Sequence, residues 1–263
     1  MGLIILIVIL GVGIGFATFF LIKSIIAPKR VERLAALVKQ KKSSAAVRVG
    51  KQIVAREPRN GDAHYFLGLA YLQDDKPELA LMELKTVNEI GNFDSMVPEI
   101  TFRERIADLY AKFNQPEEAL KEYLLLIQKE QENPAYYFKA GKLFEARGKG
   151  TRAVAYYKKA IDYEPAHDEA QMRMGKLLYR AKRPADAKGY LETAVRYQPD
   201  NYEAHFYLGK IHKENQEYRS ALSAFERSGK AQEFKGRSAM ERGVCYIKLN
   251  DMERAISELE RAV

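Results

Sequence analysis

A glycine–lysine pair recurs along this chain at one fixed spacing. The pairs Gly141-Lys142, Gly175-Lys176 and Gly209-Lys210 lie 34 residues apart each time. A period of this length is typical of chains that stack copies of one small structural unit. The repeat therefore restricts the fold to a linear array of similar units, each of which contacts its neighbours.

Three kinds of residue keep the same register in successive units. A small residue lies in the first half of each unit: Gly68, Ala107, Gly141, Gly175, Gly209 and Gly243. An alanine lies in the second half: Ala80, Ala119, Ala153, Ala187, Ala221 and Ala255. A large residue follows the small one by three positions: Tyr71, Tyr110, Phe144, Leu178, His212 and Tyr246. We expect the small residues to let two helices approach closely, and prolines such as Pro165 and Pro199 to end the units.

This combination of positions resembles the tetratricopeptide repeat family, and the resemblance covers residues 31–263. It implies an all-α fold, a right-handed α-solenoid of about six to seven helical hairpins. A single hairpin has too little core to be stable alone, so stacking supplies the burial. We expect a degenerate repeat within residues 25–58 and a solenoid over residues 59–263. Its repeats are expected at about 61–94, 100–133, 134–167, 168–201, 202–235 and 236–263.

The register slips at one point. The repeated alanine advances by 34 residues everywhere except between Ala80 and Ala119, which are 39 residues apart. The five extra residues predict a longer loop between repeats, within residues 91–100.

The N-terminal segment predicts a membrane anchor. Residues 3–22 carry no charge and are nearly all apolar. As a helix they would span about 30 Å, the thickness of a bilayer's hydrocarbon core. No lysine or arginine precedes the run, and the sequence FATFF is a poor cleavage site for a signal peptidase. We therefore expect an uncleaved transmembrane signal anchor over residues 1–24.

The positive charge is concentrated just after this segment. Residues 23–52 hold nine basic residues and one acid, Glu32. The net charge of this segment is therefore +8, the same as that of the whole chain. The positive-inside rule then predicts a single-pass inner or plasma membrane protein with its N-terminus outside and its repeats in the cytoplasm. The basic residues could also hold anionic lipid headgroups, or could act only as a topology signal. The membrane-proximal basic residues are Lys23, Lys29, Arg30, Arg33, Lys39, Lys41 and Lys42.

The sequence offers no recognisable catalytic, cofactor or metal site. A phosphate-binding loop requires Ser or Thr after its Gly-Lys pair, but Leu143, Leu177 and Ile211 stand there. One cysteine and four histidines without a complete ligand set argue against zinc. The balanced charge of residues 53–263 argues against a broad nucleic-acid interface. We expect a protein that is not an enzyme and needs no cofactor.

The resemblance implies that the first helices of the repeats line a concave groove where ligands bind. The residues after the small position supply Lys142, Lys176 and Lys210 to this groove. One turn earlier lie Phe138, Met172 and Phe206, on the same helix face. Lysines beside apolar side chains suit an extended or helical peptide that carries acids and apolar anchors. Alternatively, the lysines only keep the groove soluble.

These features predict a membrane-anchored scaffold or adaptor that binds partner proteins at the cytoplasmic face of the membrane. The layout resembles the bacterial lipopolysaccharide-assembly members of the family, without their four-cysteine metal module. One alternative is a structural subunit of a large envelope machine, such as a flagellar motor accessory, pilus or secretion assembly. Another is a receptor that targets precursor proteins. Self-association could use the Gly11/Gly15 pair or the uncapped C-terminal repeat.

Overall fold

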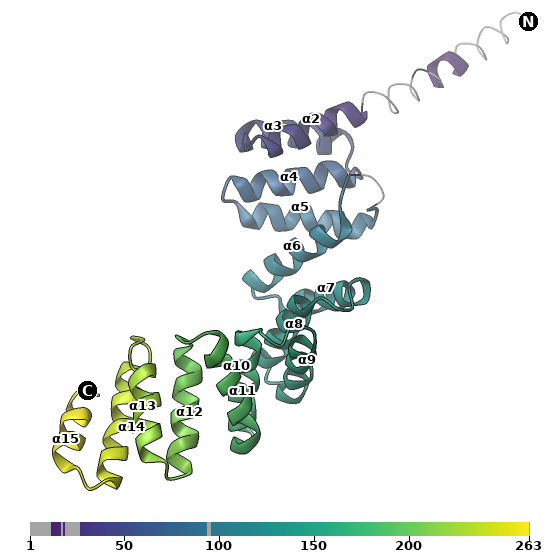
Figure 1. The fold of residues 1–263 in the computed structure, drawn as a ribbon. Helices are drawn as coiled ribbons and strands as arrows, with labels where there is room; N and C mark the ends of the chain where they lie inside the picture. The colour runs from purple at the N-terminus through teal and green to yellow at the C-terminus, as the bar shows by residue number, and fades with distance from the viewer. Residues whose placement is uncertain (1–11, 17, 19–26, 94–95, 263) are drawn as a thin grey trace, which may run out of the picture. The chain divides into compact units, whose positions relative to one another are not determined.

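The chain is built from helices. The computed structural model describes residues 12–16, 18, 27–93 and 96–262 (Figure 1). Within these ranges the regular secondary structure is helical, and none of the residues lies in a strand. The prediction of an all-α solenoid is therefore confirmed. Most of the predicted anchor, residues 1–24, falls outside the described ranges, and inside them no helix has the length and apolar character needed to cross a bilayer.

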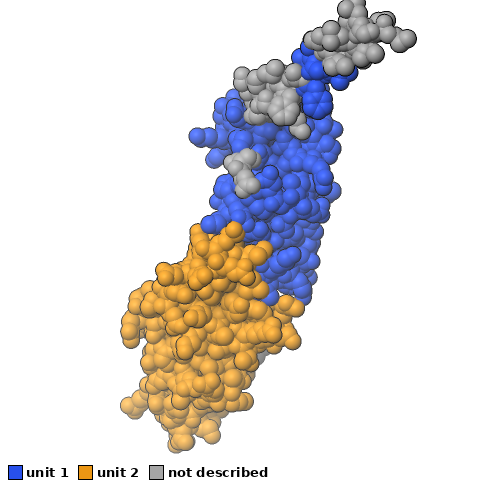
Figure 2. Space-filling view, turned by 90° about the vertical axis from the view of Figure 1, so that its right-hand side faces the viewer, with its two compact units in different colours: residues 1–122 blue, residues 123–263 orange. Residues whose placement is uncertain are grey.

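The helices form two compact units, residues 1–122 and 123–263 (Figure 2). The first unit contains α2 (Ala27–Lys39), α3 (Ser43–Arg56), α4 (Gly61–Gln73), α5 (Pro77–Ile90) and α6 (Glu99–Lys112). Helix α7 (Pro116–Lys129) begins in the first unit and ends in the second. The second unit continues with α8 (Pro134–Ala146), α9 (Gly150–Tyr163), α10 (Asp168–Arg180), α11 (Pro184–Tyr197), α12 (Tyr202–Glu214), α13 (Tyr218–Ser228), α14 (Lys235–Lys248) and α15 (Met252–Glu260).

The repeated glycines lie where the two helices of a hairpin touch. A Cβ atom added to Gly175 would lie 2.5 Å from Leu191 Cγ, and one added to Gly209 would lie 2.6 Å from Phe225 Cε1. The same close approach recurs between Gly141 and Tyr157 and between Gly243 and Leu259. At these distances a methyl group on the glycine would force the partner side chain to shift, so the expected role of the small residue in helix crossing is confirmed.

The other repeated positions are also core positions. None of the six repeated alanines exposes more than 1% of its surface: Ala80, Ala119, Ala153, Ala187, Ala221 and Ala255. Four of the large residues are buried: Tyr71, Tyr110, Phe144 and Leu178. The remaining two, His212 and Tyr246, are half-buried.

The segment expected to hold a degenerate repeat also forms a helical hairpin. Helices α2 and α3 pack on each other and on α4. Val31, Leu34 and Ile53 are buried in this packing together with Ala63 and Ala70 of α4. The extra residues predicted within 91–100 also appear, because α5 ends at Ile90 and α6 begins only at Glu99.

In four of the first helices, α4, α8, α10 and α12, a polar side chain links the helix to the turn that precedes it. Its position is four residues before the small residue, and its partner is a backbone carbonyl six residues earlier. The bonds are His64 Nε2 with Pro58 O (3.0 Å), Tyr137 Oη to Gln131 O (2.8 Å), Gln171 Nε2 to Pro165 O (2.9 Å) and His205 Nε2 with Pro199 O (2.8 Å). Each bond satisfies a backbone carbonyl of the turn, two residues beyond the end of the preceding helix.

The two histidines in this position have opposite electrostatic surroundings. His64 Nδ1 lies 2.6 Å from Glu83 Oε2, so both of its ring nitrogens face acceptors. The hydrogen bond to Glu83 is the main cause that raises the pKa of His64. His205 lacks such a carboxylate, and burial lowers its pKa, helped by the charges of Arg227 and Lys230.

We expect Gly175→Ala to destabilise the protein by about 1–3 kcal/mol, because its new methyl group would overlap Leu191 in a packed core. Thermal unfolding followed by circular dichroism, on the full chain in nonionic detergent, should show a lower midpoint. The control is Gly189→Ala in the partner helix α11, where nothing lies within 4 Å of the new atom. That variant should be more stable by up to about 1 kcal/mol through helix propensity. Equal midpoints for the two variants would contradict the packing role.

We expect His64 to titrate above its unfolded-state pKa of 6.5 and His205 below the same value. The protonated His64–Glu83 pair therefore stabilises the fold fully below pH 6.5, and this contribution is lost as the pH rises through the folded-state pKa. Glu83→Gln should lower the pKa of His64 and leave that of His205 unchanged. NMR titration of the imidazole signals measures both values, and a His64 pKa at or below that of His205 would contradict the assignment.

Candidate functional site

Two of the three predicted groove lysines form ion pairs with the next repeat. Lys142 Nζ on α8 lies 3.7 Å from Glu169 Oε1 at the start of α10. Lys176 Nζ on α10 lies 2.7 Å from Glu203 Oε1 at the start of α12. Glu169 and Glu203 occupy the same position of successive repeats, 27 residues after the lysine. These two lysines therefore already have carboxylate partners within the second unit.

The two pairs differ in strength. The side chains of Lys142 and Glu169 are 45% and 42% exposed, so water screens their attraction. The side chain of Lys176 is only 16% exposed and its pair is shorter. A ligand would have to displace Glu203 to reach the charge of Lys176.

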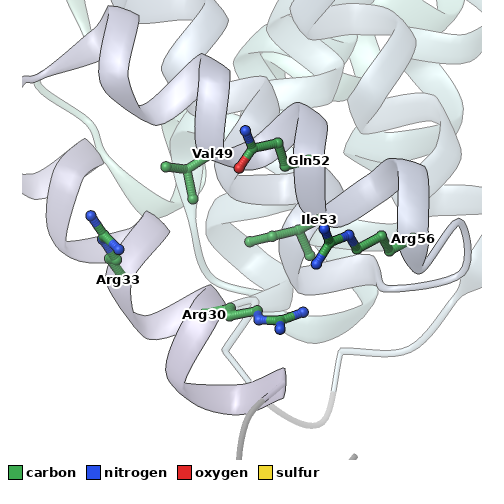
Figure 3. Close-up of a pocket in the computed structure, with 6 residues that line it drawn as sticks. All are labelled: Arg30, Arg33, Val49, Gln52, Ile53 and Arg56. Atoms are coloured by element: carbon green, nitrogen blue, oxygen red, sulfur yellow. The ribbon is translucent and has the colours of Figure 1, made fainter.

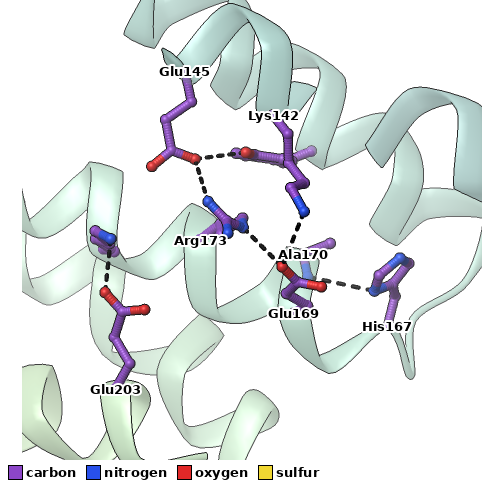
Figure 4. Close-up of polar contacts among 9 residues, drawn as sticks. Lys142, Glu145, His167, Glu169, Ala170, Arg173 and Glu203 are labelled. Carbon is purple, nitrogen blue, oxygen red and sulfur yellow. Dashed lines mark hydrogen bonds and ion pairs between the residues drawn. The ribbon is translucent and has the colours of Figure 1, made fainter. Parts of the chain in front are cut away.

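Arg173 connects the first of these pairs to the hairpin core, as Figure 4 shows. Its Nε donates to Glu169 Oε1 (3.1 Å), and its Nη1 donates to Glu145 Oε2 (3.0 Å). The Tyr157 hydroxyl also donates to Glu145 Oε2 (2.6 Å), and burial followed by this bond raises the pKa of Tyr157. Sequence reasoning missed Arg173 because the residue type at this position varies between repeats: Arg105, Lys139, Tyr207 and Glu241 stand there in others.

The third position of the series is different, because Arg237 stands where Glu169 and Glu203 stand before it. Arg237 is exposed, and its Cζ lies 4.4 Å from the ring centroid of Phe206. Lys210 Nζ lies 5.9 Å from the same centroid. Two cations therefore lie beside one aromatic ring. In the two earlier repeats a lysine–glutamate ion pair occupies the corresponding positions.

Two more aromatic rings complete this arrangement. Lys210 Nζ lies 5.5 Å from the ring centroid of Tyr179, and Arg237 Cζ lies 5.5 Å from that of Phe234. We call Tyr179, Phe206, Lys210, Phe234 and Arg237 the aromatic–cation cluster. Within the described part of the chain, neither of its cations forms an ion pair.

Two acids near Tyr179 of the cluster are bound to other groups. Glu214 accepts a hydrogen bond from the Tyr179 hydroxyl, and burial together with this bond raises the pKa of Tyr179. Glu241 pairs with Lys213. Ring faces attract cations only modestly when exposed, and they do not neutralise the charge. The cluster is therefore a surface on which an anion would supply the missing opposite charge.

The apolar half of the predicted groove is buried. Phe138, Met172 and Phe206 expose 8%, 5% and 2% of their surfaces. Phe138 packs on Tyr157 and Phe206 packs on Phe225, both in the second helix of their hairpins. These three residues are therefore core side chains of their hairpins. Their role in partner binding stays a prediction.

The predicted membrane-proximal residues lie at the start of the first unit. Arg30, Arg33 and Lys39 of α2 are exposed, as are Lys41 and Lys42 in the turn that follows. Lys23 lies outside the described residues, and so does the side chain of Lys29.

Two other features of the sequence, the Gly11/Gly15 pair and the C-terminal repeat, were expected to mediate self-association. Gly11 lies outside the described residues, and nothing lies within 4 Å of a Cβ atom built on Gly15. In the C-terminal repeat Met252 and Ile256 are 57% and 58% exposed.

Cys245 is buried, which raises its pKa to about 11. Among the residues that the structure describes, no group of three His, Cys, Asp or Glu side chains could hold a metal ion.

A family profile described as "Tetratricopeptide repeat" matches residues 34–84, 104–170, 172–227 and 209–263. A second profile of the same description matches residues 145–198. A search of curated proteins finds no match.

Solved structures share the fold at low sequence identity. The C-terminal part of a TPR repeat-containing protein from Cytophaga hutchinsonii is 15% identical with a TM-score of 0.70, over 88% of this chain and 93% of that one. MamA from Desulfovibrio magneticus RS-1 is 20% identical with a TM-score of 0.57, over 64% of this chain and 95% of that one. YrrB, described as a TPR protein with an unusual peptide-binding site, is 24% identical with a TM-score of 0.55, over 68% of this chain and 89% of that one.

Proposed function

Because this chain belongs to the tetratricopeptide repeat family, we propose that it is a scaffold that binds partner proteins through an acidic segment docked on the aromatic–cation cluster. Protein–protein interaction is the general role of such repeat surfaces, and function has to be argued from the particular site. The observation that carries the proposal is the replacement of the expected carboxylate by Arg237 beside Lys210.

The chemistry of the cluster favours a carboxylate. An arginine guanidinium binds a carboxylate through two parallel hydrogen bonds, and a lysine ammonium adds a point charge. The rings of Tyr179, Phe206 and Phe234 limit where the two cations can lie. An Asp or Glu side chain, or a C-terminal carboxylate, would take the place that Glu169 and Glu203 fill in the earlier repeats.

The ion pairs elsewhere support this choice of site. Lys142 and Lys176 have internal partners, so an acidic ligand gains little by competing for them. Lys210 has none in the described chain, so an acidic ligand does not have to break an existing bond. The shared fold with YrrB adds a precedent for peptide binding in this fold class, without transferring any residue.

The proposal places the scaffold at a membrane. The apolar run at residues 3–22 supports a single N-terminal anchor, and the basic residues that follow it support a cytoplasmic position of the repeats. We propose a non-enzymatic role, in keeping with the absence of a recognisable catalytic motif in the sequence. With the proposed anchor and the repeats, the layout resembles that of the lipopolysaccharide-assembly members of the family.

We expect the full chain, held in nonionic detergent, to select peptides rich in Asp and Glu from a random phage-displayed peptide library. The double variant Lys210→Gln/Arg237→Gln should lose this selection, and the affinity of a selected peptide, measured by fluorescence anisotropy, should fall at least about tenfold because a charge-assisted contact is lost.

A matched control separates the site from overall charge. Lys158→Gln/Arg219→Gln also removes one lysine and one arginine, but from exposed positions on the second helices α9 and α13. It should bind the selected peptide like the unchanged protein. Equal losses in both double variants, or no loss in the cluster variant, would refute the assigned site.

We expect the full chain to remain in the membrane pellet after alkaline carbonate extraction of cells that produce it. A variant that lacks residues 1–22 should move to the supernatant, because it lacks the apolar run long enough to cross a bilayer. Release of the full chain by carbonate would contradict the anchor, while leaving the peptide-binding proposal open to its own test.

A further inference from the structure

The first unit contains a second basic feature, independent of the aromatic–cation cluster. A cavity of about 180 Å³ lies between α2 and α3, lined by Arg30, Arg33, Val49, Gln52, Ile53 and Arg56 (Figure 3). The figure shows Arg30 and Arg33 extending from α2 and the other four side chains from α3. A liquid water molecule takes about 30 Å³, so the cavity has room for a group much larger than one water.

The polar part of the lining is rich in hydrogen-bond donors and contains no acid. Three guanidinium groups and the Gln52 amide line the cavity, and no Asp or Glu does. In the described part of the chain, none of the three arginines forms an ion pair. The acids nearest in sequence do not join the lining: Glu32 is exposed on α2, and Glu57 accepts a hydrogen bond from Asn60 Nδ2 (2.7 Å).

Arg30, Arg33 and Arg56 are exposed, and three like charges around one cavity that is open to solvent attract an anion. We propose that this cavity binds a phosphate group. Phosphate presents several acceptor oxygens to several guanidiniums at once, and arginine forms bidentate hydrogen bonds with it. A singly charged carboxylate would leave most of the donors unused.

The lining also contains an apolar wall. Val49 and the buried Ile53 lie on the same helix as Gln52 and Arg56. A phosphate ester with hydrocarbon next to its headgroup could contact this wall, while a small soluble phosphate would use only the donors. The basic excess of residues 23–52 would raise the local concentration of either kind of anion.

Isothermal titration calorimetry on the full chain in nonionic detergent tests the proposal with two probes. Glycerol 3-phosphate is a soluble phosphate monoester, and dihexanoyl phosphatidic acid carries a phosphate monoester with acyl chains; empty micelles serve as the blank. We expect saturable binding of at least one probe. Binding of the lipid at least about tenfold tighter would identify a lipid headgroup as the ligand, and equal binding would identify a soluble phosphate. Both results support the phosphate site.

The variant Arg30→Gln/Arg33→Gln/Arg56→Gln should weaken binding at least about tenfold. The matched control is Lys39→Gln/Arg48→Gln/Lys51→Gln, which removes the same charge from exposed residues of the same two helices that do not line the cavity. It should weaken binding by less than about threefold. Circular dichroism checks that both variants keep their helices, and the single variant Arg56→Gln replaces the triple variant if they do not. No saturable binding of either probe, or equal losses in both variants, would overturn the proposal.

Discussion

Every hairpin of the second unit depends on the contact between a glycine and a large side chain of the partner helix. At Gly175 the space for a Cβ atom is already filled by Leu191, and at Gly209 by Phe225. This contact sets how close the two helices lie. The close approach in turn buries the repeated alanines and leaves the residue after each glycine at the edge of the packing. The positions of Lys142, Lys176 and Lys210 therefore follow from the small volume allowed to the glycine that precedes each of them.

The periodic part of this architecture could be predicted from the sequence, because packing at one period demands the same residue sizes in each repeat. The turn between the helices of each hairpin was not visible in the same way. It places one residue in the left-handed region, seven positions after the small residue: Asp75, Asn114, Gly148, Lys182, Gln216 and Asn250. Side-chain chemistry varies freely there because only the backbone conformation is shared, so no residue type marks the position.

The candidate site could likewise be predicted from the sequence only in part. The lysine series was visible as a pattern, but which lysine has a partner depends on a residue 27 positions later on another helix. The buried state of Phe138, Met172 and Phe206 also depends on packing that residue type alone does not define. Arg237 could not be singled out from the sequence because its importance lies in a difference from Glu169 and Glu203. A repeat protein acquires a specific site where one copy departs from the others, while the shared positions maintain the frame.

The most direct test of this account is the single substitution Arg237→Glu, with acidic-peptide affinity and thermal midpoint measured on the same preparation. The substitution restores the acid found in the two earlier repeats, within reach of Lys210. The account predicts an unchanged or higher unfolding midpoint, because a new ion pair forms, together with the loss of acidic-peptide binding. Retained binding at the original affinity would contradict the claim that the departure at Arg237 creates the site.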